Sequence, residues 1–320
     1  MNILAIQNRM GIGDTVIFLP YIKAISEKYN TPVNILVKEN SKADQYLYNT
    51  DYINKIIILD RKNNSGGKHD GILGSLNLIK DLKEYNFDKV FIFNSSLRFN
   101  LIAKLAKIPE IFQYPLFKKT NQHIIKTAKN FIENELNLKI NEDPKINLLP
   151  KLITDTVEKY NIDKNKTNIL LGTGGSGPTK RIPAETFLKV IEKIVLEKKC
   201  HFFLATGKND EEQLILNKII NSRFNKICTP LDNLSIKDTL PIIKNCNLAI
   251  CNDTGFGHLS AALGIETVML MADAPLMYGN YSTKMFPILP EGEKTVGHGT
   301  RGKDKISPIK IYEKIKEILD

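Results

Sequence analysis

Short runs of β-branched and aliphatic residues alternate with longer amphipathic stretches along most of this 320-residue chain. Such alternation is typical of parallel strands joined by crossover helices, and it restricts the fold to the α/β class. In the first half of the chain, the pattern predicts strands at residues 2–7, 33–37, 55–59 and 89–93, and helices at 14–29, 72–85 and 97–107.

The alternation breaks between residues 109 and 150, where four prolines surround one polar helix candidate at 121–136. Because proline has no N–H to donate, we interpret this stretch as an excursion followed by an interdomain linker. A second α/β series restarts with a strand at 168–171 and ends with a helix at 307–319. At roughly 100–200 residues per domain, this length also predicts two domains, which we place at 1–160 and 161–320.

The charge balance and the cysteines bear on the partners of the protein and on its cellular compartment. Lys plus Arg exceeds Asp plus Glu by 45 to 35, and this excess favours anionic partners, although a generic solvated surface explains it equally well. The four cysteines form no C-x-x-C pair and lie in or beside apolar segments, which predicts reduced core residues. We expect no signal peptide and no spanning helix, hence a cytoplasmic protein that at most rests on the inner membrane face.

The first of three glycine-containing loops follows the opening strand. Its sequence, NRMGIGD, imitates the start of a dinucleotide fingerprint, but the third glycine is replaced by Val16 and no acid ends the next strand at Val37. A dinucleotide-dependent oxidoreductase is therefore a remote alternative. The loop places Asp14 at the start of a helix, where a carboxylate can either cap the helix or face the ligand crevice.

The second loop, GTGGSGPTKR, follows the first strand of the second domain. Its glycines let backbone N–H groups approach an anion, and Lys180 and Arg181 add positive charge. The loop is not a Walker A motif, because Pro178 occupies the position of the essential lysine. Either a phosphate-binding loop of another type or a merely flexible turn fits this pattern.

The third loop, NDTGFGH, lies between a strand and a helix. The free N–H groups at the helix start, the Thr254 hydroxyl and two glycines form a natural seat for a diphosphate. His258 is either part of this seat or a structural histidine with satisfied hydrogen bonds. None of the three loops contains the D-x-D pair of a metal-assisted diphosphate site, so we expect no metal and no cofactor.

Together, the segments GIGDTVIFLP, GPTKRIPAETF and NDTGFGHLSAALG resemble those of glycosyltransferase family 9, in particular the ADP-heptose:lipopolysaccharide heptosyltransferases. The third segment carries the family pattern D-[ST]-G-x-x-H followed by a small-residue helix. The order and spacing of the segments agree across nearly the whole chain.

The resemblance implies two facing Rossmann-like domains in the B-type glycosyltransferase architecture, and we expect the C-terminal helix to pack back on the first domain. The first domain would bind a lipopolysaccharide-core or related cell-envelope glycan acceptor, and the second a nucleotide-diphosphate sugar, by default ADP-heptose. The implied reaction is a metal-independent, inverting sugar transfer. Asp14 matches the family's catalytic base, and the implied donor-binding residues are Ser176, Lys180, Asp253, Thr254, Gly255 and His258.

This sequence departs from the family pattern around the donor sugar. Ile182 stands where the family usually shows an aromatic residue, the chain has no Trp, and Asn209 replaces an acid of some members. These departures leave open a transferase of another nucleotide sugar. A non-catalytic sugar-nucleotide-binding protein is a further alternative, against which the presence of Asp14 argues.

The acceptor is expected to be anionic and to be a glycolipid or an oligosaccharide, not a nucleic acid. Basic residues follow the strands of the first domain, and we assign acceptor binding to Arg61, Lys62, Lys68 and Arg98. The intervening glycine-rich segment, residues 63–74, is expected to be mobile until the acceptor binds.

Overall fold

The computed structural model describes residues 1–62, 66–116 and 123–320. The chain divides into two compact units, Met1–Pro144 and Lys145–Asp320. This division falls before the expected residue 160, because the segment after Pro144 already contacts the second unit. The backbone N–H of Ile146 donates to the Ala262 carbonyl oxygen at 2.9 Å.

Five parallel strands form the sheet of the first unit, in the order β3-β2-β1-β4-β5. Their bounds are β1 (Ile3–Ile6), β2 (Val33–Lys38), β3 (Ile53–Leu59), β4 (Lys89–Ile92) and β5 (Glu110–Gln113). The sequence pattern missed β5, a four-residue edge strand whose two ends are polar. This unit also contains the short 3-10 helices η1 (Glu39–Ser41) and η2 (Ala43–Gln45).

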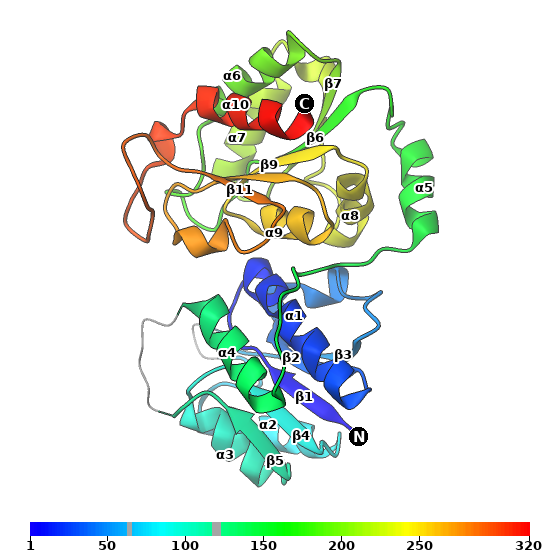
Figure 1. The fold of residues 1–320 in the computed structure, drawn as a ribbon, viewed down its shortest axis with the longest axis vertical. Helices are drawn as coiled ribbons and strands as arrows, with labels where there is room; N and C mark the ends of the chain where they lie inside the picture. The colour runs from blue at the N-terminus through cyan, green and yellow to red at the C-terminus, as the bar shows by residue number, and fades with distance from the viewer. Residues whose placement is uncertain (63–65, 117–122) are drawn as a thin grey trace. The chain divides into compact units, whose positions relative to one another are not determined.

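Helices cover both faces of this sheet (Figure 1). Helix α1 (Ile12–Tyr29) packs with α4 (Ile124–Leu136), and α2 (Gly71–Lys83) packs with α3 (Leu97–Leu105). Alternate residues of a strand point to opposite faces, so that in β4 Val90 and Ile92 join the core beneath α2 and α3 while Phe91 contacts Phe131 of α4. The first unit is therefore a three-layer α/β/α structure.

Six parallel strands form the sheet of the second unit, in the order β11-β10-β9-β6-β7-β8. Their bounds are β6 (Thr167–Gly172), β7 (Cys200–Ala205), β8 (Cys228–Pro230), β9 (Leu248–Asn252), β10 (Thr267–Leu270) and β11 (Met285–Ile288). Pro287 interrupts the donor pattern of β11, which is tolerated because β11 is an edge strand. The short 3-10 helices are η3 (Asn225–Ile227), η4 (Leu276–Tyr278) and η5 (Lys303–Lys305).

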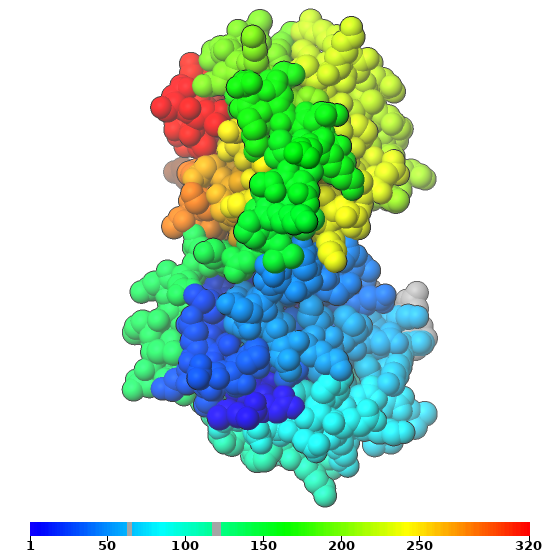
Figure 2. Space-filling model, turned by 90° about the vertical axis from the view of Figure 1, so that its right-hand side faces the viewer, coloured from blue at the N-terminus to red at the C-terminus, as the bar shows by residue number. Residues whose placement is uncertain are grey.

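Helices α6 (Ala184–Val195) and α7 (Asp210–Ile220) cover one face of the second sheet. Helix α8 (Ile236–Lys244) packs with both α9 (Gly255–Ala262) and α5 (Pro150–Lys159). The sequence pattern missed α5, which begins where the stretch interpreted as a linker, residues 109–150, ends. Figure 2 shows its residues lying across the surface of the second unit.

The last helix, α10 (Pro308–Leu319), packs against α6. Its Ile311 and Ile315 side chains are buried in the core of the second unit, with Phe187 and Ile191 of α6 in the same cluster. The expectation that this helix packs back on the first domain is therefore not confirmed. Its apolar face is already buried against the second unit.

Both sheets reverse their strand order at one point, between β1 and β4 in the first unit and between β6 and β9 in the second. In open α/β sheets, ligands bind beyond the carboxyl ends of the strands at such switch points. The three glycine-containing loops follow β1, β6 and β9. The expected fold class is confirmed, and the fold brings the second and third loops to one switch point.

Candidate active site

The loops after β6 and β9 are tied together at the switch point of the second unit. Asn252, the last residue of β9, is fully buried. Its Nδ2 donates hydrogen bonds to the carbonyl oxygens of Thr173 at 2.8 Å and Gly174 at 3.0 Å. A side chain from one loop thus fixes the backbone of the other, and both loops are held in place before any ligand arrives.

Lys180, Asp253 and His258 form a charged cluster across these loops. The Lys180 Nζ donates to Asp253 Oδ2 at 2.5 Å, and the other carboxylate oxygen lies 3.5 Å from His258 Nε2. Asp253 and His258 are buried, whereas the Lys180 side chain is 20% exposed. The cluster therefore presents its cation toward solvent and keeps its anion inside.

The electrostatics of the cluster favour an ionised Asp253. Burial alone would raise the pKa of this carboxyl, but the hydrogen bond and charge of His258, together with Lys180, outweigh burial and lower the pKa to about 2. His258 is positioned in turn by Tyr281, whose hydroxyl lies 2.7 Å from His258 Nδ1 and whose ring stacks on the imidazole.

Several polar side-chain atoms at this sheet edge have no hydrogen-bond partner within the described residues. Thr254 is the N-cap residue of α9, yet its hydroxyl makes no cap bond. The other three are Thr173 Oγ1, Thr206 Oγ1 and Asn252 Oδ1. Since buried polar groups are normally paired, this edge is suited to a polar ligand. Gly255 begins α9, and Ser176 is exposed in the loop after β6.

Glu212 is a part of this region that the sequence analysis missed. Its buried carboxylate accepts the Gly175 N–H at 2.6 Å and lies 3.9 Å from Arg181 Nε. Arg181 Nε also donates to the Gly175 carbonyl oxygen at 3.0 Å. A Cβ on Gly174 would lie 2.7 Å from Glu212 Oε1, so this glycine is required by the close approach of the carboxylate. Through its hydrogen bond to Gly175, Arg181 thus fixes the glycine loop after β6.

Asp273 is a second residue that the sequence analysis did not assign to the site. Its Oδ1 accepts the backbone N–H groups of Gly299 at 2.8 Å and Arg301 at 2.9 Å. Burial raises its pKa, but a hydrogen bond from Thr179 and these two N–H groups outweigh burial and lower it. Asp273 therefore connects the glycine loop after β6 to residues 299–301.

Asp14 lies at the switch point of the first unit. The N-cap of α1 is Gly11, so Asp14 occupies the third helical position. Its carboxylate accepts the Gly11 N–H at 3.1 Å and pairs with Arg9 Nε at 2.9 Å. The side chain is 19% exposed, so it is accessible at the carboxyl end of β1. Its structural contact is a capping-box bond instead of the N-cap role considered from the sequence.

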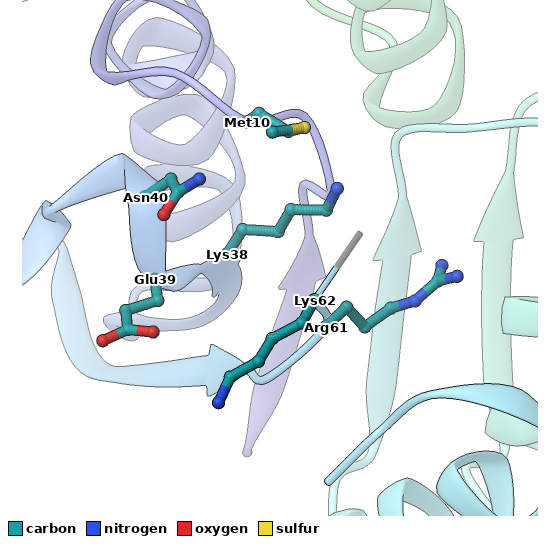
Figure 3. Close-up of a pocket in the computed structure, with 6 residues that line it drawn as sticks. All are labelled: Met10, Lys38, Glu39, Asn40, Arg61 and Lys62. Carbon is teal, nitrogen blue, oxygen red and sulfur yellow. The ribbon is translucent and has the colours of Figure 1, made fainter. Parts of the chain in front are cut away.

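A basic pocket of about 210 Å³ opens beside this switch point. Figure 3 shows Arg61 and Lys62, adjacent in the chain after β3, extending in opposite directions, with Lys38 from the end of β2 between them and Met10. Glu39 and Asn40 complete the lining. We call these six residues the basic pocket. It includes two of the four cations assigned to acceptor binding.

Lys68 and Arg98, the other two assigned cations, do not line the basic pocket. Lys68 Nζ pairs with Asp81 at 2.6 Å, while the Arg98 guanidinium donates to the backbone carbonyl oxygens of His69 and Gly71. The glycine-rich segment expected to be mobile is only partly within the described residues, since 63–65 lie outside them. Its described part is well connected, because the Asp70 carboxylate accepts N–H groups from residues 62, 66 and 67.

Two kinds of feature are absent from the part of the chain that the structure describes. Within residues 1–62, 66–116 and 123–320, no group of three His, Cys, Asp or Glu side chains is arranged to hold a metal ion. In the same ranges, no helix has the length and apolar character needed to cross a bilayer. All four cysteines are free and buried, as the sequence predicted.

Two Rossmann-type units with ligand loops at their switch points define the B-type glycosyltransferase class of fold. The particular family follows from comparison with known proteins. Residues 75–291 match the model of glycosyltransferase family 9, the heptosyltransferases. The chain therefore belongs to that family and is a glycosyltransferase, which confirms the resemblance inferred from the three loops.

Individual relatives agree with this assignment. Lipooligosaccharide heptosyltransferase 2 of Campylobacter jejuni is 27% identical over 326 residues, with 96% of each chain covered. The structure of E. coli ADP-heptose lipopolysaccharide heptosyltransferase II has a TM-score of 0.74 at 16% identity, covering 100% of this chain and 98% of that one. An E. coli heptosyltransferase solved with ADP has a TM-score of 0.73 at 11% identity, with 100% of both chains covered.

Proposed function

We propose that this protein transfers heptose from ADP-heptose to the core of a lipooligosaccharide or lipopolysaccharide, with inversion and without a metal ion. The observation that carries the proposal is the cluster of Lys180, Asp253 and His258 at the switch point of a family 9 chain. Relatives named for ADP-heptose and for lipooligosaccharide support the two substrate classes. We place the reaction in the cytoplasm, at the inner membrane face.

The second unit is proposed to hold the donor. Lys180 Nζ and the N-terminal amides of α9 supply positive charge where a diphosphate would lie. The diphosphate would compete with Asp253 for the lysine, and Asp253 would stay ionised because His258 still faces it. An ionised carboxylate in this position can accept hydrogen bonds from sugar hydroxyls. Ser176, Thr254 and Gly255 are assigned to the same donor site.

Asp14 is proposed to be the general base. Its carboxylate takes the proton of the acceptor hydroxyl while that oxygen attacks the anomeric carbon of the donor. The new carbon–oxygen bond forms as the bond to the diphosphate breaks, and ADP leaves with its charge neutralised by Lys180. One displacement of this kind inverts the anomeric configuration.

The basic pocket is proposed to bind anionic groups of the acceptor. Lys38, Arg61 and Lys62 contribute three cations against Glu39 in the lining and against Asp70, which pairs with Arg61 at 3.5 Å, so the pocket keeps a net positive charge. Phosphate or carboxylate substituents on a core oligosaccharide have the complementary charge. Lys68 and Arg98, assigned with them from the sequence, are proposed to act on the acceptor only indirectly, because both already bind other groups of the first unit.

The direct test is a transfer assay with ADP-heptose and a heptose-free core oligosaccharide. We expect release of ADP, a product of inverted anomeric configuration by NMR, and an unchanged rate in the presence of EDTA. Preference for another nucleotide sugar, retention of configuration or loss of activity in EDTA would each refute the corresponding part of the proposal. Tight ADP binding without transfer would instead identify a non-catalytic sugar-nucleotide-binding protein.

A further inference from the structure

Helices α2 and α3 of the first unit expose large apolar side chains on their outer faces. Ile72 is 85% exposed and Leu73 is 77% exposed, which is unusual for residues of this size. Four leucines on the same two helices are also exposed. The complete set, which we call the α2–α3 surface, is Ile72, Leu73, Leu76, Leu97, Leu101 and Leu105.

These side chains belong to neighbouring elements and are not needed by the core. The two helices pack against each other, and Arg98 at the start of α3 donates to the carbonyl oxygen of Gly71 at the start of α2. Leu97, Leu101 and Leu105 are spaced by four residues and so lie along one stripe of α3. The opposite face of α3 fills the core with other residues. The α2–α3 surface is thus a second apolar face with no partner within the described residues.

The charges around this surface are mostly positive. Between Asp88 and Glu110 the sequence contains no acidic residue, and this stretch includes the whole of α3. The exposed lysines on and just after the two helices are Lys80, Lys83, Lys104 and Lys107. Exposed acids near α2 are fewer: Asp70 before the helix pairs with Arg61, Asp81 on the helix pairs with Lys68, and Glu84 and Asp88 beyond it are exposed. Apolar side chains with a basic rim are the chemistry that an anionic bilayer surface recognises.

Part of the α2–α3 surface lies toward the same edge of the first sheet as the basic pocket. Helix α2 is the next helix after β3, and α3 is the next helix after β4, so the first residues of both helices lie toward the carboxyl edge of the sheet, the edge that carries the basic pocket. Ile72, Leu73 and Leu97 all belong to the first turns of these helices. A bilayer in contact with them would therefore lie on the side of the unit where the basic pocket opens.

We propose that the α2–α3 surface docks this protein on an anionic lipid bilayer, with the apolar side chains entering the interface and the lysines contacting the headgroups. A second copy of the chain is a less suitable occupant. A symmetric pairing would place the cations of α3 against those of its copy, with no acid on that helix to neutralise them. Docking does not depend on the proposed reaction, although presentation of a lipid-linked acceptor to the basic pocket does.

The test is cosedimentation of the full chain with vesicles of phosphatidylglycerol and phosphatidylethanolamine, compared with phosphatidylcholine vesicles. The variant Ile72→Asn/Leu73→Asn/Leu101→Asn should lower binding to the anionic vesicles by about tenfold or more, since it removes the inserting side chains. The matched control is Leu196→Asn/Leu214→Asn, two leucines of the second unit that are 81% and 63% exposed. It should bind like the unsubstituted protein.

Equal binding by the triple variant and its control would overturn the proposal, as would equal binding of the unsubstituted protein to both kinds of vesicle. A concentration-dependent dimer in sedimentation velocity that only the triple variant abolishes would identify a copy interface instead. Transfer to a lipid-free acceptor separates docking from the proposed reaction. The triple variant should retain it, whereas failure of the unsubstituted protein in that assay would refute the reaction and leave the docking result standing.

Discussion

The switch points of the two units differ in how their charges are used. In the second unit, Lys180 and His258 both bind Asp253, and Glu212 fixes the neighbouring glycine loop from a buried position. In the first unit, the cations of the basic pocket line an open space, and Arg61 among them makes a long ion pair, 3.5 Å, with Asp70. The same strand order thus supports a preorganised site in one unit and an open, solvated site in the other.

This difference predicts how sensitive each site is to substitution. Removing one partner of a buried, hydrogen-bonded charge costs a large amount of free energy, because the remaining group is left without a hydrogen bond. Removing one partner of an exposed ion pair costs little free energy, because water replaces the partner. Substitutions of charges that bind a ligand should therefore cost more in the second unit than in the first, whereas Asp14 of the first unit is an exception because its proposed role is in the reaction itself.

The largest effect is expected for Asp14→Asn, because a general base has no substitute in water. Turnover should fall by ~10²–10⁴-fold, about 3–5 kcal/mol of transition-state stabilisation, in a steady-state transfer assay. The asparagine amide oxygen can still accept the Gly11 N–H, so the melting temperature should stay near that of the unsubstituted protein.

The matched control for this substitution is Asp44→Asn, an exposed carboxylate of the same unit. It should leave turnover unchanged. ADP affinity, measured by calorimetry, should be unchanged in both variants because the donor belongs to the second unit. Normal turnover of Asp14→Asn would restrict Asp14 to its bond at the start of α1.

Lys180→Ala should weaken ADP binding by roughly 1.5–3 kcal/mol, about 10- to 150-fold, the range for hydrogen bonds to charged groups. It should also raise the pKa of Asp253 from about 2, since the lysine helps to hold that pKa down. Calorimetry and NMR titration measure the two effects. Lys189→Ala, an exposed lysine of α6, should change neither, and equal behaviour of the two variants would remove Lys180 from the donor site.

Much of the contrast between the two sites could be predicted from the sequence. The periodicity predicted most strands and helices, and the position of each loop after its strand identified Asp14, Lys180 and Asp253 as site candidates. The sequence could not predict that Lys180 binds Asp253, because the two residues are 73 positions apart and come together only through the pairing of β6 with β9.

The features that the sequence did not predict share one physical cause. Strand β5 is stabilised by pairing with β4, and helix α5 by packing on α8, contacts that a local pattern does not contain. Glu212 is also a charged residue in the first turn of a helix, where a solvated carboxylate is ordinary. The role of Glu212 can be recognised only in the structure, where Gly174 and Gly175 lie against its carboxylate.

Glu212→Gln should have a smaller effect than Lys180→Ala. The amide still reaches the Gly175 N–H but loses its charge, which should cost about 1 kcal/mol. ADP affinity should fall several-fold and the melting temperature by about 2–4 °C. Glu211→Gln is the control, since Glu211 is exposed and contacts the same arginine, Arg181. If the control had the larger effect on calorimetric affinity, the loop would not depend on the buried carboxylate.

The smallest effect is expected in the basic pocket, from Arg61→Gln/Lys62→Gln. Exposed charges contribute about 0.2–1 kcal/mol each, so acceptor affinity should fall only several-fold at low salt. Because the attraction is screened, affinity of the unsubstituted protein should decrease with ionic strength, and the double variant should show a flatter dependence. Lys28→Gln, an exposed lysine of α1 outside the pocket, should keep the original slope. A double variant that lost affinity a hundredfold at low salt, or kept the full salt dependence, would show that the pocket is preorganised like the donor site, and the contrast between the two units would fail.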